Sequence, residues 1–127
     1  MKGIERFGLP KPGATPAAQA VAADGWLFVA GQVPRDANGN IVYGDITVQA
    51  RQTLDNLVSR LSMAGYTTKD VVRVTVYLDD TRDFAAFNTV YREYFSAEDA
   101  PARVCVQAHM VVDIKVEIDC IAWKAAQ

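Results

Sequence analysis

Two alternating runs near the end of the chain, residues 103–110 and 115–123, constrain the fold most strongly. Apolar and polar side chains alternate in each run, as they do in a strand with one buried face. We expect the two runs to pair as a hairpin and to join their apolar faces. The opposite face would then carry Arg103, Cys105 and Glu117 together, and this mixture of groups makes that face the candidate functional site.

The remaining pattern completes a two-layer α+β domain. Strands are expected over residues 19–23, 26–30, 41–43 and 71–78. Helices are expected over residues 45–64 and from Thr81 or Asp83 to about Phe95, because apolar residues recur there at helical spacing. Residues 1–16, rich in proline and glycine, are expected to be irregular. The result is a mixed sheet of about six strands with two helices on one face, and the uncovered face predicts self-association.

Size and charge limit the classes of partner. A chain of 127 residues is expected to form a single domain over 1–127. A net charge of −2 gives no electrostatic footprint for nucleic acid or for an anionic membrane. No apolar run approaches the roughly 20 residues of a membrane span and no signal-peptide pattern is present, so a cytoplasmic location without membrane contact is expected.

The two cysteines and the single histidine do not suggest a metal site. Cys105, Cys120 and His109 match no zinc-ligand spacing. Alternation predicts that the two thiols lie on opposite faces and stay reduced. No base is expected beside Cys105 to activate it as a nucleophile, and His109 is expected at the surface or in an interface.

Several segments together resemble the RidA (YjgF-like) family of reactive-intermediate deaminases over nearly the whole chain. They are FVAGQVP at 28–34, QARQTLDNL at 49–57, VVRVTVYL at 71–78, the aromatic segment 84–95, PARVCV at 101–106 and KVEID at 115–119. The resemblance implies a chorismate-mutase-like fold assembled as a homotrimer, with sites in the clefts between subunits. It also implies hydrolysis of enamines and imines, such as 2-aminoacrylate and 2-imino acids, to 2-oxo acids and ammonia without a cofactor.

The same resemblance assigns roles to five residues. Arg103 would bind the substrate carboxylate, for which a guanidinium offers two parallel charge-assisted hydrogen bonds. Gly31 and Cys105 would contribute mainly backbone groups, and Asn88 would lie near the site. Glu117 would sit near the attacking water and shuttle a proton, provided that the cleft raises its pKa towards neutrality.

Structural alternatives remain open for several of these residues. Arg103 would instead form an ion pair across the hairpin with Glu117 or Asp119 if its role were structural. Asn88 lies in a helix whose aromatic stripe is expected to face the core, which favours a hydrogen-bonded structural role.

The chain also departs from the family pattern. Ala17 stands where characterised deaminases usually have a tyrosine, and Val111 and Val112 replace a common Pro-Lys pair. The missing tyrosine predicts a more open pocket. It keeps two alternatives to a general imine deaminase: a pathway-specific enzyme such as a 2-aminomuconate deaminase, and a non-catalytic trimer that binds a small metabolite or a partner.

Overall fold

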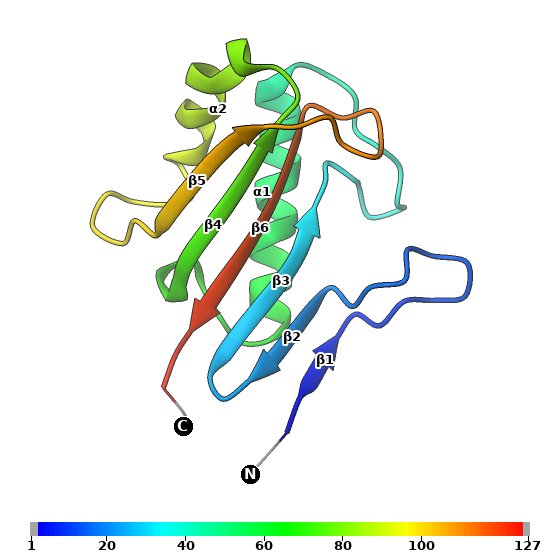
Figure 1. Cartoon of the computed structure of the whole chain (residues 1–127), viewed down its shortest axis with the longest axis vertical. Helices are drawn as coiled ribbons and strands as arrows, with labels where there is room; N and C mark the ends of the chain where they lie inside the picture. Colours follow the sequence, from blue (N-terminus) through cyan, green and yellow to red (C-terminus); the bar gives the residue numbers. More distant parts are fainter. Residues whose placement is uncertain (1–2, 126–127) are drawn as a thin grey trace.

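A computed structural model gives the structure of the chain over residues 3–125; the ends of the expected domain, 1–2 and 126–127, lie outside the described residues. Six strands form one mixed sheet in the order β1-β2-β3-β6-β4-β5, and two helices lie behind it (Figure 1). The strands are β1 (Glu5–Phe7), β2 (Ala20–Ala23), β3 (Trp26–Gln32), β4 (Val71–Leu78), β5 (Ala102–Gln107) and β6 (Val116–Trp123). The helices are α1 (Ile46–Met63) and α2 (Phe84–Tyr91); the 3-10 turn η1 (Thr68–Asp70) precedes β4, and the 3-10 turn η2 (Thr81–Asp83) precedes α2.

Helix α1 has the predicted bounds to within one residue at each end, because its sequence carries both end signals. The side chain of Asp45 accepts a hydrogen bond from the backbone nitrogen of Val48 at 3.0 Å and so caps the first turn. Gly65 follows the helix with a φ of 84°, the left-handed conformation that ends helices. Between these ends Leu54, Leu57 and Leu61 are fully buried against the sheet.

The second helix starts and ends differently from the prediction. Asp80, rather than Thr81 or Asp83, accepts a hydrogen bond from the backbone nitrogen of Arg82, and this bond opens the turn η2. Regular helix ends at Tyr91, although Phe95 beyond it is still buried. The expectation that the aromatic stripe faces the core is confirmed for the buried Phe87, Tyr91 and Phe95, whereas Phe84 remains 46% exposed.

The N-terminal part contains one strand that was not predicted and lacks one that was. The hairpin of β2 and β3 turns at Asp24 and Gly25, whose φ angles of 53° and 87° suit a two-residue turn. Residues 5–7, expected to be irregular, pair with β2 as strand β1. The expected edge strand 41–43 is reduced to an isolated bridge between Ile41 and Arg35.

The predicted hairpin of the last two strands is wrong. Strand β5 pairs in parallel with β4, and β6 lies between β3 and β4, antiparallel to both. Arg103 lies opposite the buried Val74, so its side chain points to the helix side, while Val104 and Val106 are 37% and 42% exposed on the other face. The predicted faces of β5 are therefore inverted. Alternation tells which residues share a face but does not tell which face is buried, least of all in an edge strand.

The two cysteines lie on the same side of the sheet, which corrects the prediction of opposite faces. Cys120 lies opposite Val74 and Cys105 opposite Val76, with strand β4 between them. Two strand spacings are about 10 Å, beyond the reach of a disulfide. Both thiols are free, as predicted, but the reason is distance across the sheet.

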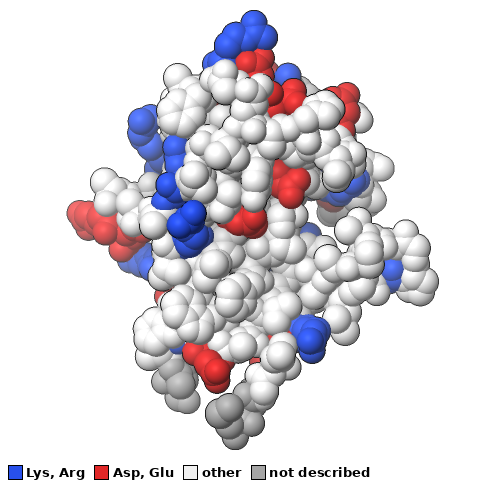
Figure 2. All heavy atoms as spheres, viewed as in Figure 1, with Lys and Arg blue, Asp and Glu red and all other residues white. Residues whose placement is uncertain are grey.

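The core fills the space between the helices and the sheet, and the other face of the sheet has no cover among the described residues. Figure 2 looks onto this open face and shows mostly uncharged atoms with single charged side chains among them. Trp26 and Phe28 of β3 and Trp123 of β6 lie on it with 42%, 48% and 44% of their surface exposed. No helix within residues 3–125 is long and apolar enough to cross a membrane.

Candidate active site

Arg103 is held on the helix side of the edge strand by a polar and an aromatic contact. Its Nη2 donates a hydrogen bond of 2.9 Å to Oδ1 of Asn88 on α2. Its guanidinium carbon lies 4.7 Å from the ring centroid of Tyr91, and the rings of Phe84 and Phe87 lie at 5.8 and 5.9 Å. Stacking on aromatic faces and a side-chain hydrogen bond fix the orientation of a long, flexible side chain.

The guanidinium retains unused donors. Within residues 3–125 Arg103 forms no ion pair with a carboxylate, and its one side-chain hydrogen bond is to Asn88. The alternative of a cross-strand pair with Glu117 or Asp119 is wrong, because both carboxylates lie on the opposite face of the sheet. An arginine has five N–H donors, so this one has the capacity to take an incoming carboxylate.

The buried hydroxyl of Tyr91 adds a neutral polar group to the surroundings of the Arg103 guanidinium. Burial raises the pKa of Tyr91 to about 12, with the neighbouring Arg103 acting in the opposite direction. The hydroxyl has no hydrogen-bond partner among the described residues. From the sequence, the aromatic stripe predicts Tyr91 only as a core residue. Nothing in the spacing of such a stripe shows which of its rings also contacts an arginine of the site.

Cys105 follows Arg103 on the same side of β5. Burial raises the pKa of its thiol, and the guanidinium of Arg103 only partly opposes this effect. A raised pKa favours the thiol over the thiolate, so the surroundings of Cys105 do not activate it; its lack of a nucleophilic role stays a prediction.

The backbone of Cys105 lies at a free edge. Ala108 N donates to Leu78 O at 2.9 Å, so the backbone groups of Ala108 and of every second residue before it point towards β4. Successive residues of a strand direct these groups to opposite edges. The N–H and C=O of Arg103 and Cys105 therefore point away from the sheet and remain available to a ligand or a second chain.

Gly31 and Glu117 meet on the open face. A Cβ atom at Gly31 would collide with the carboxylate of Glu117, so glycine is what permits this close approach. Burial and then the nearby Asp119 raise the pKa of Glu117. The hydroxyl of Tyr77 lies 3.4 Å from Oδ2 of Asp119 beside it. Within the described residues the carboxylate of Glu117 has no cationic partner that would offset this rise in its pKa.

The five predicted site residues thus form two groups on opposite faces. The arginine cluster is Asn88, Arg103 and Cys105, on the helix side of β5; the carboxylate cluster is Gly31 and Glu117, on the open face. The prediction that Arg103 and Glu117 share one face of a hairpin is corrected accordingly. A single copy of the chain does not bring the two clusters together.

Two other predictions concern residues outside these clusters. The side chain of His109 is 96% exposed, with Nδ1 at 3.3 Å from Oδ1 of Asp79, so its expected surface position is confirmed. Ala17 is exposed in the loop before β2. No group of three or more potential metal ligands occurs within residues 3–125.

Known proteins resemble this chain both in sequence and in fold. A family model described as Endoribonuclease L-PSP matches residues 11–124. A RutC family protein of Pyrococcus horikoshii is 50% identical over 117 residues, 91% of each chain. A 2-iminobutanoate/2-iminopropanoate deaminase of Salmonella typhimurium is 37% identical over 110 residues, 84% of this chain and 86% of the relative.

Solved structures extend the likeness to three dimensions. A putative endoribonuclease from Thermotoga maritima is 34% identical, with a TM-score of 0.86 over 99% of each chain. The structure of E. coli TdcF with bound serine, also 34% identical, has a TM-score of 0.82 and covers 98% of this chain and 100% of that one. By family match, sequence identity and fold, the chain belongs to the RidA (YjgF-like) family.

Proposed function

We propose that this chain is a cofactor-free deaminase that hydrolyses small 2-imino acids and their enamine tautomers to 2-oxo acids and ammonia. The observation that carries the proposal is the state of Arg103, which is oriented by Asn88 and Tyr91 yet has no carboxylate partner among the described residues. The relative named 2-iminobutanoate/2-iminopropanoate deaminase and the TdcF structure with bound serine support a small carboxylate as ligand.

To catalyse this reaction the protein must position the substrate and transfer a proton to it. Arg103 would hold the carboxylate, and the free backbone N–H of Cys105 lies on the same edge of β5 to orient the group next to it. Water adds to the imine carbon to give a carbinolamine, whose nitrogen must gain a proton before the carbon–nitrogen bond breaks and ammonia leaves. A protonated Glu117 would donate that proton, and its raised pKa supports this role.

We place the site between two copies of the chain, in a cyclic homotrimer. The arginine and carboxylate clusters lie on opposite faces, so a site that uses both needs the arginine cluster of one copy and the carboxylate cluster of the next. The apolar open face supplies a surface for such an assembly, since exposed patches of this kind mark association.

The direct test measures loss of 2-iminobutanoate, generated in situ by an amino-acid oxidase, with the native chain and with Arg103→Ala. We expect accelerated release of ammonia that the variant abolishes. No acceleration by a folded native protein would defeat the proposal and favour a binding role. Acceleration that survives Arg103→Ala would defeat the carboxylate anchor.

Mixing two inactive variants tests the location of the site. Arg103→Ala and Glu117→Gln subunits, unfolded together and reassembled at equal amounts, would restore about a quarter of the sites if each site takes one residue from each of two neighbouring copies. Sites contained within one copy would stay inactive in every mixture. Light scattering on the same samples gives the oligomeric state.

The family description, Endoribonuclease L-PSP, favours one further candidate activity. Incubation with a labelled RNA oligomer tests it under the same conditions. Cleavage by the native chain without any effect on imines would replace the deaminase proposal.

A further inference from the structure

A cavity of about 230 Å³ lies along β5 next to the arginine cluster. Its lining residues are Leu78, Thr81, Phe84, Cys105, Val106 and Gln107. Leu78 and Gln107 are register partners, and Cys105 lies opposite Val76, so the side chain of Cys105 shares the helix side with Arg103. Phe84 joins the two places, because its ring both lines the cavity and lies 5.8 Å from the guanidinium carbon of Arg103.

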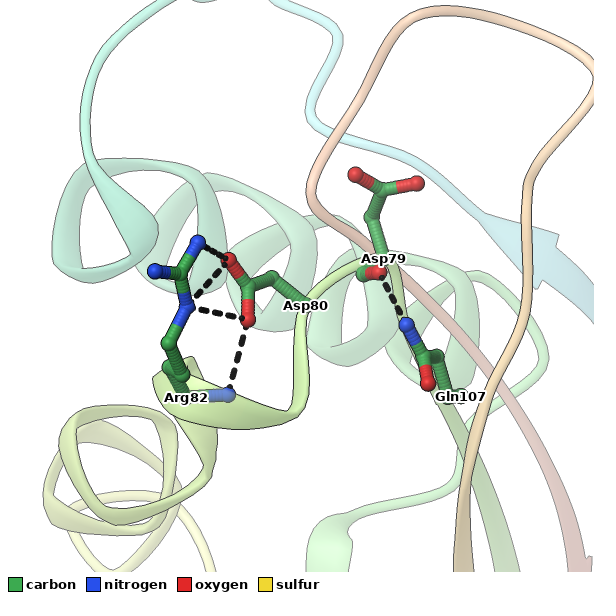
Figure 3. Close-up of polar contacts among 4 residues, drawn as sticks. All are labelled: Asp79, Asp80, Arg82 and Gln107. Carbon is green, nitrogen blue, oxygen red and sulfur yellow. Dashed lines mark hydrogen bonds and ion pairs between the residues drawn. The ribbon is translucent and has the colours of Figure 1, made fainter.

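The lining of this cavity is uncharged and partly apolar. Leu78 is 2% exposed and Phe84 is 46% exposed, and none of the lining residues is charged. The one cation of the adjoining turn η2, Arg82, is already paired: it forms an ion pair of 2.7 Å with Asp80, the residue before the turn (Figure 3). The cavity therefore offers an apolar side chain a wall to pack against and offers a second carboxylate no cation.

Two polar side chains, of Gln107 and Thr81, also belong to the lining. Nε2 of Gln107 donates to the backbone oxygen of Asp79 at 3.0 Å, and Figure 3 shows the amide oxygen of Gln107 directed away from that bond. This hydrogen bond holds the side chain of Gln107 in place in the lining. Thr81, the first residue of η2, also lines the cavity.

The dimensions suit a side chain larger than methyl or ethyl. A cavity of about 150 Å³ is enough to hold benzene, and this one exceeds that volume. Along a strand, residues on one side recur about every 6.6 Å. The cavity lining at Cys105 is therefore within reach of the side chain of a small acid whose carboxylate is held at Arg103.

Building on the proposed function, we propose that this cavity receives the side chain of the substrate, so that the chain prefers 2-imino acids with branched or aromatic side chains to those with methyl or ethyl groups. Each methylene group buried here would raise kcat/KM by roughly fourfold. The isobutyl side chain has two more carbons than ethyl and three more than methyl, so its advantage would be roughly 15-fold over ethyl and roughly 60-fold over methyl.

The test compares imines formed in situ from alanine, 2-aminobutanoate, leucine and phenylalanine. We expect kcat/KM for the leucine and phenylalanine imines to exceed that for the alanine imine by more than about tenfold, and by roughly 60-fold for leucine if each added carbon is buried. Calorimetry with the corresponding 2-oxo acids gives the same order without catalysis, and 2-oxoglutarate, a dicarboxylate, should bind more weakly than 4-methyl-2-oxopentanoate.

Two variants fill the cavity from different walls, so that one remains informative if the other fails to fold. Thr81→Phe and Gln107→Phe should each bring the leucine-to-alanine ratio close to one. Thr47→Phe, on the exposed side of α1, is the matched control and should keep the native ratio.

The outcomes separate this inference from the function on which it rests. Hydrolysis of all imines with the small ones preferred, or unchanged ratios in both filling variants, would overturn the side-chain site and leave the deaminase intact. Tighter binding of the dicarboxylate would also overturn it. Absence of hydrolysis with every imine would overturn both.

Discussion

A single substitution at Asn88 separates its structural contact from the proposed carboxylate anchor. Asn88→Asp places a carboxylate where an amide oxygen now lies 2.9 Å from Nη2 of Arg103. The new carboxylate would pair with the guanidinium and repel a carboxylate substrate. Asn88→Ala removes the same hydrogen bond and adds no charge, so it is the matched control.

The separation between the introduced carboxylate and the substrate carboxylate sets the size of the repulsion. A substrate carboxylate on the far side of the guanidinium, with a second charge-assisted bond of about 2.8 Å, would lie about 5.5 Å from the carboxylate that Asn88→Asp introduces. At an effective dielectric constant of about 20, two carboxylates at that separation repel by about 3 kcal/mol. This corresponds to roughly 150-fold in affinity or in kcat/KM. The alanine variant should lose about 1 kcal/mol, or roughly fivefold, from weaker orientation of Arg103.

The assay is calorimetric binding of 2-oxobutanoate, followed by kcat/KM for 2-iminobutanoate. The loss in Asn88→Asp should appear mainly as a weaker Kd and a higher KM, because the repulsion acts on bound substrate and transition state alike. Added salt should reduce it. Thermal melting serves as the folding control, and Asn88→Asp should not melt below Asn88→Ala, since Arg103 gains an ion pair.

Two results would refute the reasoning. Equal losses in both variants would mean that Asn88 acts only through the position of Arg103 and that no carboxylate binds beside it. Native affinity in Asn88→Asp would mean that Arg103 does not receive the substrate carboxylate.

Three further tests concern Glu117 and the core. Gly31→Ala should cost about 1–3 kcal/mol in urea unfolding from overpacking against Glu117, and the loss should shrink in a Glu117→Ala background; full additivity would contradict the collision. Burial and Asp119 raise the folded-state pKa of Glu117, so the stability linked to its neutral form is present at low pH and is lost as pH rises through that pKa. Glu117→Gln should therefore melt above the native chain at pH 8, by a margin that disappears on acidification; a margin independent of pH would contradict the shift. Phe87→Ala should lower the free energy of unfolding by about 3–5 kcal/mol because the ring is fully buried. Phe84→Ala on the same helix should lower it by less than about 1 kcal/mol. Equal losses in the two variants would contradict the assignment of Phe87 to the core and Phe84 to the surface.

The features that sequence predicted well are those fixed by local signals. Helix α1 has an apolar stripe, a capping Asp45 and a terminal Gly65, and its bounds agree with prediction to within a residue or two. The turn at Asp24 and Gly25 is equally local. These residues act on their own segment, so no knowledge of the rest of the chain is needed.

Strand pairing could not be predicted from local sequence signals. The alternation in 103–110 and 115–123 fits a hairpin and fits two strands separated by a third equally well. Burial decides between them, because Val74 and Val76 of β4 complete the core next to β6. The decision depends on contacts between segments about 40 residues apart, which alternation within one run does not encode.

The inverted face of β5 also changes the argument for assembly. Had Arg103 and Glu117 shared a face, one copy would have contained a complete site, and association would have rested only on the uncovered sheet. With Arg103 turned towards α2 and Glu117 turned away from it, the proposed chemistry itself requires a second copy. The free edge of β5, with the backbone of Cys105 unpaired beside the guanidinium, offers such a copy a place to bind. Assembly and activity should therefore be lost together when the open face is made charged, and Phe28→Glu, at a side chain 48% exposed there, separates the proposed trimer without touching either cluster.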